Sequence, residues 1–241
     1  MKLTRVGVDL AKQVFQVHGV DRAERPVWCK RLKRSRWIAD LERDVEPGAE
    51  IGMEACGSAH HWGRLLQSKG YRVKLIAPQF VKPYVKTNKT DANDAEAICE
   101  AMSRPSMRFV AVKSEAKQAS AVIFRTRDVL VGQRTQLINA IRGHLSEYGL
   151  IAPQGPFHVE KLIAQIKDPA SDLPQAARTC LSVLVDALRH LQEQTAALDA
   201  EIAARAKADD VTRRLMTVPG IGPLIATAIE ALAPPPETFR S

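Results

Sequence analysis

Four acidic residues, far apart along the chain, have the type and setting expected of metal ligands. Asp91 and Asp94 lie three residues apart at the start of a predicted helix, so both carboxylates leave its first turns on one face. Asp9 stands inside the apolar stretch 6–10, and Glu54 ends the apolar stretch 51–54. Carboxylate oxygens suit Mg²⁺ or Mn²⁺, and such a site can clamp a phosphodiester. We take these four acids as candidate catalytic and metal-binding residues.

A plainer interpretation of Asp91 and Asp94 is that they only cap a solvated helix, with Thr90 or Asp91 as the cap. The two upstream acids argue against it, since both end or interrupt apolar runs. Four carboxylates gathered in one place would repel each other unless a divalent cation neutralised them. The metal-site hypothesis therefore depends on the elements that bring the acids together.

Those elements form an α/β pattern with a mixed sheet. Three strands in sequence are followed by alternating helices and strands, which is typical of such a fold. The first strand, a neighbouring strand and a later helix can then present their acids at one edge of the sheet. The pattern predicts strands at 4–10, 14–20, 26–33, 50–54, 71–76 and 109–112, and helices at 36–44, 60–68, 78–85 and from 91 onward.

Composition limits the class of protein. The chain has 241 residues, of which 45% are hydrophobic and 26% charged, as in a globular protein with two domains. No apolar run is long enough to span a membrane, and the first residues lack a signal-peptide core, so we expect a cytoplasmic protein without a membrane partner. The four cysteines have no paired spacing, which indicates neither a disulfide framework nor a zinc site.

The net charge of +8 is distributed unevenly and favours a nucleic-acid partner over an ordinary solvated surface. One basic cluster covers 30–36, a second runs through 60–90 without a single acid, and a third covers 104–142. Lys82, Lys86 and Lys89, in the second run, are candidate phosphate contacts.

The second half of the chain is helical. Phe124, Val131, Ile138 and Leu145 recur every seven residues, and a second heptad stripe runs from Leu181 to Ile202. We expect the two helices to pair antiparallel as a coiled-coil hairpin, which either contacts another chain or is an internal hairpin that meets none.

Near the end of the chain, Pro219-Gly220-Ile221-Gly222 lies between two short amphipathic segments. This pattern predicts a helix-hairpin-helix, in which Gly220 and Gly222 let a phosphate approach backbone N–H groups. A plain glycine turn between packed helices is the alternative.

Three motifs in this order and spacing resemble the DEDD transposases of the insertion sequence 110 family, including its 1111 subgroup. The resemblance implies a ribonuclease-H-like (RuvC-like) domain over 1–112 with the four acids as its metal site, a coiled-coil domain over 113–207, and the start of a transposase domain over 208–241. The motifs are Gly7-Val8-Asp9-Leu10-Ala11-Lys12, Met53-Glu54-Ala55-Cys56-Gly57-Ser58 and Lys89-Thr90-Asp91-Ala92-Asn93-Asp94-Ala95.

The same resemblance implies partners. A structured guide RNA (bridge RNA) would specify donor and target DNA, and the coiled coil would join a homo-oligomer, a dimer or tetramer, and touch RNA. Arg127 and Arg134, the two cations in the otherwise apolar stripe of the first long helix, are candidate nucleic-acid contacts.

One departure from the family is visible. Its members continue past the hairpin into a segment with a serine nucleophile, whereas this sequence stops at Ser241, so we expect a C-terminally truncated transposase unable to complete strand exchange. Two alternatives stay open: a metal-dependent junction-resolving endonuclease, and a non-catalytic nucleic-acid-binding scaffold.

Overall fold

The computed structural model describes residues 3–85 and 90–234. It divides into two compact units, one that extends to Glu115 and takes in Pro234, and one that covers Ala116–Ala233. The three-domain division expected from the sequence stays a prediction. Across the described residues, no helix is both long enough and apolar enough to cross a bilayer.

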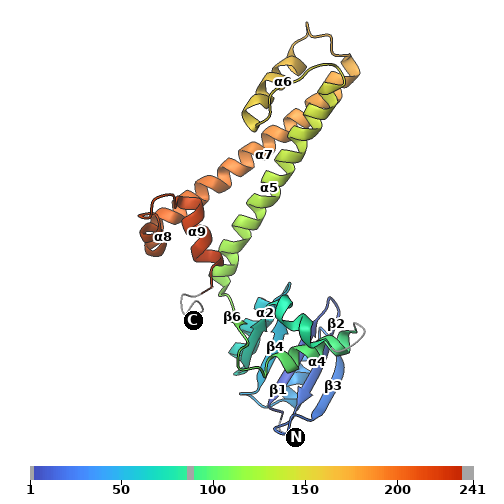
Figure 1. The fold of residues 1–241 in the computed structure, drawn as a ribbon, viewed down its shortest axis with the longest axis vertical. Coiled ribbons are helices and arrows are strands. Elements are labelled where there is room, and N and C mark those ends of the chain that lie inside the picture. The colour runs from blue at the N-terminus through green and yellow to red at the C-terminus, as the bar shows by residue number, and fades with distance from the viewer. Residues whose placement is uncertain (1–2, 86–89, 235–241) are drawn as a thin grey trace. The chain divides into compact units, whose positions relative to one another are not determined.

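A six-stranded mixed sheet forms the first unit, as the sequence predicts (Figure 1). Its order is β3-β2-β1-β4-β5-β6, with β1 parallel to β4, β4 parallel to β5, and the other neighbours antiparallel. The strands are β1 (Arg5–Leu10), β2 (Val14–Val20), β3 (Pro26–Lys33), β4 (Glu50–Glu54), β5 (Arg72–Ile76) and β6 (Phe109–Val110).

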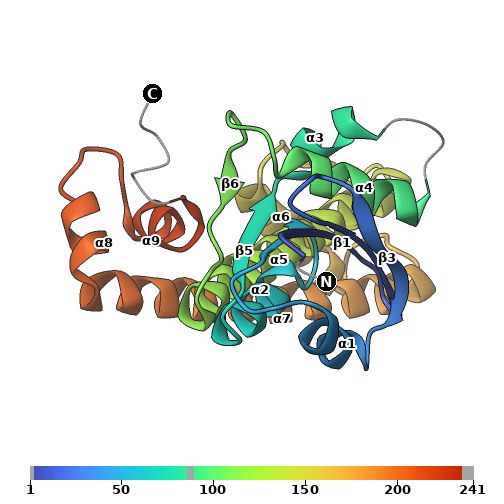
Figure 2. The ribbon, with the colours of Figure 1, turned by 90° about the horizontal axis from the view of Figure 1, so that it is seen from below.

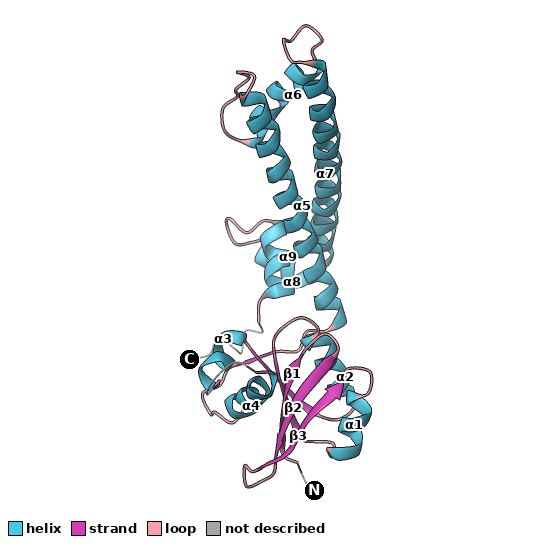
Figure 3. Ribbon diagram, turned by 90° about the vertical axis from the view of Figure 1, so that its right-hand side faces the viewer, coloured by secondary structure: helices cyan, strands magenta, loops and turns pink. Residues whose placement is uncertain are grey.

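Helices cover both faces of this sheet: α1 and α2 lie on one side, and α3 and α4 on the other (Figures 2 and 3). Their bounds are α1 (Trp37–Asp44), α2 (Ala59–Ser68), α3 (Pro78–Val81), continued by the 3₁₀ turn η1 (Lys82–Tyr84), and α4 (Asp91–Ala101). Alternation along the strands assigns each side chain to one face.

The α1/α2 face carries the larger core. Val6 and Val8 of β1 pack there with Phe15 of β2. Trp37 of α1 and Trp62 of α2 meet Phe15 and each other edge to face, with ring centroids 5.2–5.5 Å apart. Such aromatic pairs add specific geometry to the burial of apolar area, so this side of the sheet is firmly fixed.

The opposite face is nearly flat where α4 lies on it. A Cβ on Gly7 of β1 would stand 2.3 Å from the carbonyl oxygen of Ala95 and 2.6 Å from the backbone nitrogen of Cys99. A Cβ on Gly52 of β4 would stand 2.0 Å from the sulfur of Met102. At Gly7 the backbone of α4 leaves no room for a side chain, whereas at Gly52 the space is filled by the side chain of Met102, just after α4.

The second unit is entirely helical in the residues described (Figure 1). Two long helices run antiparallel, and α6 packs beside them at the end where α5 stops and α7 starts. Two short helices pack on the other end of α7 (Figure 2). The bounds are α5 (Glu115–Ser146), η2 (Pro156–His158), α6 (Val159–Lys167), α7 (Gln175–Ala208), α8 (Asp210–Leu215) and α9 (Pro223–Leu232).

The heptad positions of α5 and α7 face each other in one antiparallel register. Phe124 shares a buried cluster with Ile202, while Ile138 and Leu145 share another with Leu188 and Leu181. Residues later in α5 thus pack with residues earlier in α7, as an antiparallel pair requires. Supercoiling and the joining of protomers through these helices stay predictions.

Candidate active site and nucleic-acid interface

Asp9 and Glu54 end neighbouring parallel strands on the same face of the sheet. The register of β1 and β4 pairs Gly7 with Gly52 and Val8 with Met53, so the next residues along are Asp9 and Glu54. Since side chains alternate, both acids face the side on which α4 lies over the two glycines. Both are half-buried, at the edge of the sheet where β1 and β4 end.

The thiol of Cys56 lies near this pair of acids. Cys56 follows β4 in the loop before α2. Burial raises the pKa of its thiol, and the negative charges of Glu54 and Asp9 raise it further. Both carboxylates are therefore close enough to Cys56 to act on its thiol.

α4 brings its first turn to the same edge. Cys99, near its C-terminal end, interacts with Arg5 at the start of β1, and Ala95 lies over Gly7. The helix therefore runs antiparallel to β1. Four helical residues and two strand residues each advance about 6–7 Å, so Asp91 comes roughly level with Asp9.

The helix start has the capped geometry that the sequence predicts. Thr90 is the N-cap, and its hydroxyl accepts a hydrogen bond of 3.3 Å from the backbone N–H of Asn93. Asp91 is exposed and Asp94 is half-buried. Acids in a first turn also interact favourably with the positive end of the helix dipole, so capping and metal binding are compatible roles.

Within the described part of the chain, no three His, Cys, Asp or Glu side chains are gathered closely enough to hold a metal ion. The arrangement is instead one acidic pair on the sheet, Asp9 with Glu54, and a second pair on the first turn of α4, Asp91 with Asp94. The two pairs share an edge and a face without closing into one coordination shell.

The predicted nucleic-acid contacts differ in their surroundings. Lys86 and Lys89 lie outside the described residues, and Lys82 is exposed in η1. Arg127 forms an ion pair across the hairpin, with its Nε 2.5 Å from Oδ1 of Asp199. This bond occupies its guanidinium, a role that sequence reasoning missed because the partner is distant in sequence.

Arg134 is placed differently. Its Nε is buried without a hydrogen-bond partner in the described structure. Its side chain lines a hollow of about 640 Å³ together with Asn139, Arg142 and Gln154. Arg142 is engaged there, since it donates to the backbone oxygens of Ala152 and Gly155.

Two helices, α8 and α9, flank the predicted hairpin turn. Gly220 has a φ of +85°, a conformation that favours glycine, whereas Gly222 is the N-cap of α9 with a φ of −87°. Phosphate binding by either glycine stays a prediction.

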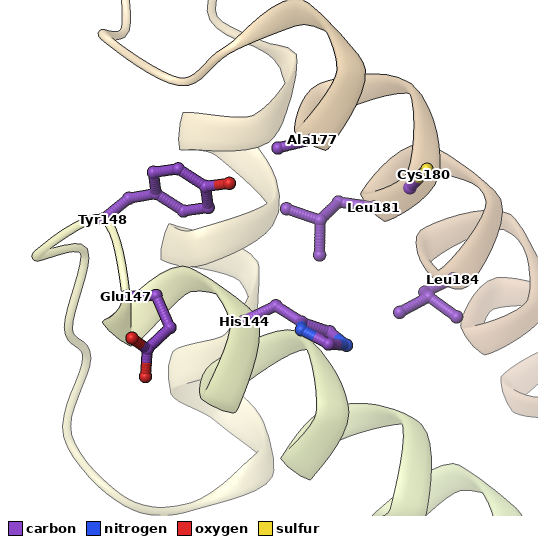
Figure 4. Close-up of a pocket in the computed structure, with 7 residues that line it drawn as sticks. All are labelled: His144, Glu147, Tyr148, Ala177, Cys180, Leu181 and Leu184. Carbon is purple, nitrogen blue, oxygen red and sulfur yellow. The ribbon is translucent and has the colours of Figure 1, made fainter.

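A second hollow was not predicted from the sequence (Figure 4). Its volume is about 430 Å³, and it lies between the last turns of α5 and the first turns of α7. It is lined by His144, Glu147, Tyr148, Ala177, Cys180, Leu181 and Leu184. The mixture of apolar and scattered polar side chains gives it no catalytic constellation.

Comparison with known proteins decides the family. The model of the DEDD transposases of insertion sequence IS110, described as a transposase, matches residues 6–150. The chain belongs to this family. The match covers β1, β4 and α4, so it includes the elements that carry all four acids. The six-stranded mixed sheet with its helices is compatible with a ribonuclease-H-like DEDD domain.

Individual relatives agree. A Pseudomonas aeruginosa protein named "Probable family 20 transposase" is 49% identical over 244 residues, which cover 100% of this chain and 71% of the relative. The Coxiella burnetii transposase for insertion sequence element IS1111A is 40% identical, covering 94% of this chain and 62% of its own length. A Sinorhizobium fredii protein, also named as a transposase, is 43% identical over the whole chain and is covered to 61%. The chain thus spans 61–71% of the length of these relatives.

Proposed function

We propose that this protein is a DNA transposase of the IS110 family whose ribonuclease-H-like unit acts on phosphodiesters with Mg²⁺ or Mn²⁺ held by Asp9, Glu54, Asp91 and Asp94. The observation that carries the proposal is the shared placement of the two acidic pairs. Asp9 and Glu54 end adjacent strands, and the first turn of α4 comes level with them on the same face.

The chemistry of the donor set fits a hard divalent cation. All four side chains offer carboxylate oxygens, which Mg²⁺ and Mn²⁺ prefer, and substrate phosphates would complete the shell. A bound cation would neutralise charge on the phosphate and activate the attacking oxygen. The protein's own contribution is to orient the acids: β1 and β4 hold Asp9 and Glu54 at a fixed register, and the Thr90 cap fixes the first turn that bears Asp91 and Asp94.

A small adjustment would join the two pairs. Carboxylates repel each other without a counter-charge, so bringing a third acid beside Asp9 and Glu54 costs free energy that a cation offsets. Asp91 is exposed and can change rotamer without unpacking a core. Closure of the four-acid shell is therefore coupled to cation binding.

The remaining family properties are proposed for the complete protein. These are a structured guide RNA that specifies donor and target DNA, strand exchange by a serine nucleophile assisted by the acids, and a dimer or tetramer joined through α5 and α7. Arg134 supports the RNA contact, since its buried Nε lacks a partner and its side chain lines a polar hollow.

Cation binding tests the site directly. We expect Mn²⁺ to raise the melting temperature of the protein, because a ligand at 100 times its Kd stabilises the folded state by about 2.7 kcal/mol. Asp9→Asn, Glu54→Gln and Asp91→Asn should abolish the rise and leave the metal-free melting temperature nearly unchanged.

Glu50→Gln is the matched control, because Glu50 lies on the same face of β4 at its other end. Its variant should keep the Mn²⁺ response. Equal stabilisation of the wild type and Asp9→Asn would contradict the proposed site. Efficient hydrolysis of branched DNA by this chain alone, lost in Asp9→Asn, would instead favour a junction-resolving endonuclease.

A further inference from the structure

Strand β3, one of the two edge strands of the sheet, and the residue that follows it carry basic side chains that alternate between two faces. Lys30 and Arg34 turn towards the α1/α2 side, where both have partners. The Nζ of Lys30 lies 2.9 Å from Oδ2 of Asp44. The guanidinium of Arg34 lies 5.2 Å from the ring centroid of Trp62 and 5.7 Å from that of Phe15. These two cations stabilise the packing of the sheet against its helices.

Arg31 and Lys33 belong to the opposite face, the one that carries the acids. The register pairs Asp9 with Gln16, and Gln16 with Arg31, so these three residues form one row across β1, β2 and β3. Lys33 pairs with Val14, at the end of the hairpin next to the β1–β2 turn. Both basic side chains are exposed.

In the described structure, the side chains of Arg31 and Lys33 form no hydrogen bond or ion pair. On the same face, burial raises the pKa of the Cys29 thiol on β3, and the negative charge of Glu96 on α4 raises it further. Two of the five basic residues in this cluster therefore have a structural role, and two are available for a ligand on the acidic face.

The distance between the cations and the acids suits a nucleic-acid strand. Adjacent strands lie about 5 Å apart, so the Cα atoms of Asp9 and Arg31, two strands apart, are roughly 10 Å from each other. That distance corresponds to about three nucleotides at an axial rise of 3.4 Å. A strand whose phosphate reaches the acids thus extends naturally over β3.

We propose that Arg31 and Lys33 bind the phosphodiester backbone of the DNA strand that enters the acidic site. The inference rests on the function proposed above. Four carboxylates repel DNA, so a compensating positive surface is needed on the same face. An arginine can bind a phosphate through two parallel hydrogen bonds, and the neighbouring lysine adds a mobile point charge.

The salt dependence of DNA binding tests this assignment. Affinity of the full chain for duplex DNA is measured from 50 to 200 mM salt in EDTA, so that a failed metal site does not affect the outcome. Loss of two phosphate contacts should make the slope of log K against log [salt] shallower by about 1.8, because each contributes about 0.9. Over this fourfold range the wild type should lose about 12-fold more affinity than Arg31→Ala/Lys33→Ala.

Arg22→Ala/Arg25→Ala is the charge-matched control. Both residues are exposed in the turn at the other end of the same hairpin. The control should keep the wild-type slope, and both double variants should melt at the wild-type temperature. The variant Arg31→Gln/Lys33→Gln repeats the test with side chains that are uncharged, as alanine is, but longer and polar.

Three outcomes would overturn the inference: an unchanged slope in both β3 variants, an equal loss in the control, or a loss confined to duplex RNA, which would mean that β3 binds RNA. If the β3 variants show the expected shallower slope while the wild type shows no response to Mn²⁺, the metal site is refuted and the DNA contact of Arg31 and Lys33 is retained.

Discussion

Replacing Gly7 by alanine should separate α4 from the sheet and weaken the acidic site at a distance. The added Cβ would lie 2.3 Å from the carbonyl oxygen of Ala95 and 2.6 Å from the nitrogen of Cys99, both backbone atoms of α4. Ordinary contacts begin near 3.4 Å, so the helix must move by about 1 Å. No side-chain rotation can relieve the clash.

The expected cost follows from that geometry. Overpacking a well-filled interior by one methyl group costs about 1–3 kcal/mol, and the alanine regains less than 1 kcal/mol through its lower backbone entropy. We therefore expect Gly7→Ala to lower the free energy of unfolding by about 1–3 kcal/mol. Asp91 and Asp94 lie on the first turn of the displaced helix, so the affinity for Mn²⁺ should fall as well, although no metal ligand has been replaced.

Gly52→Ala is the informative comparison. Its Cβ would meet the Sδ and Cγ of Met102, the C-cap of the same helix, on the same sheet face. Because that obstacle is a flexible side chain, the cost should be smaller than at Gly7. Urea unfolding gives both values, as a lower midpoint at unchanged m. A Gly7→Ala protein with wild-type stability and wild-type Mn²⁺ affinity would show that α4 does not lie on β1.

Three further predictions concern other parts of the molecule. A double-mutant cycle of Arg127→Ala, Asp199→Ala and the double variant should give a coupling energy of about 0.5–1 kcal/mol, since the ion pair is partly solvated. Zero coupling would argue against the register in which α5 and α7 pack. Gly220→Ala should cost about 1–2 kcal/mol in thermal unfolding, because alanine disfavours φ near +85° even in open space, and an unchanged protein would mean that the turn adapts. Hydrogen bonds from Arg43, the largest cause, and then from Lys30 hold the pKa of Asp44 below its usual range. The stability that ionised Asp44 gives the folded protein is therefore complete above about pH 4 and is lost as the pH falls further. Acid unfolding of Asp44→Asn should lack this loss of stability, and an acid profile like that of the wild type would contradict the assignment.

The strands were the most predictable part of the fold. The structure has β2, β3 and β4 at the bounds expected from alternating apolar residues, and Arg5–Leu10 differs by one residue from the predicted first strand. The alternation of apolar and polar residues along a strand is local and follows from the burial of one face, so it can be recognised in the sequence. The long helices were predictable for the same reason, since many heptad positions are buried: Phe124, Ile138 and Leu145 of α5, and Leu181, Leu188, Thr195 and Ile202 of α7.

The placement of α4 could not be predicted in the same way. Gly7 and Gly52 appear in the sequence as ordinary strand glycines, and only the fold shows that each lies beneath the same helix. The role of Arg127 was hidden for a related reason, because its partner Asp199 is 72 residues away. Local patterns specify the elements, whereas contacts between distant elements decide which side chains remain available for a ligand.

The same reasoning links the acids to the edge strand. On the α4 face, a row across the sheet runs from the acid Asp9 through the neutral Gln16 to the cation Arg31. A cation directly beside Asp9 would compete with a divalent metal for its carboxylate, whereas one beyond a neutral neighbour leaves the carboxylate to the metal and still attracts phosphate. Placing a cation directly beside Asp9, as in Gln16→Lys, should therefore weaken Mn²⁺ binding while strengthening DNA binding in EDTA. If both affinities rose together, the separation of acids from cations across β2 would have no role in metal binding.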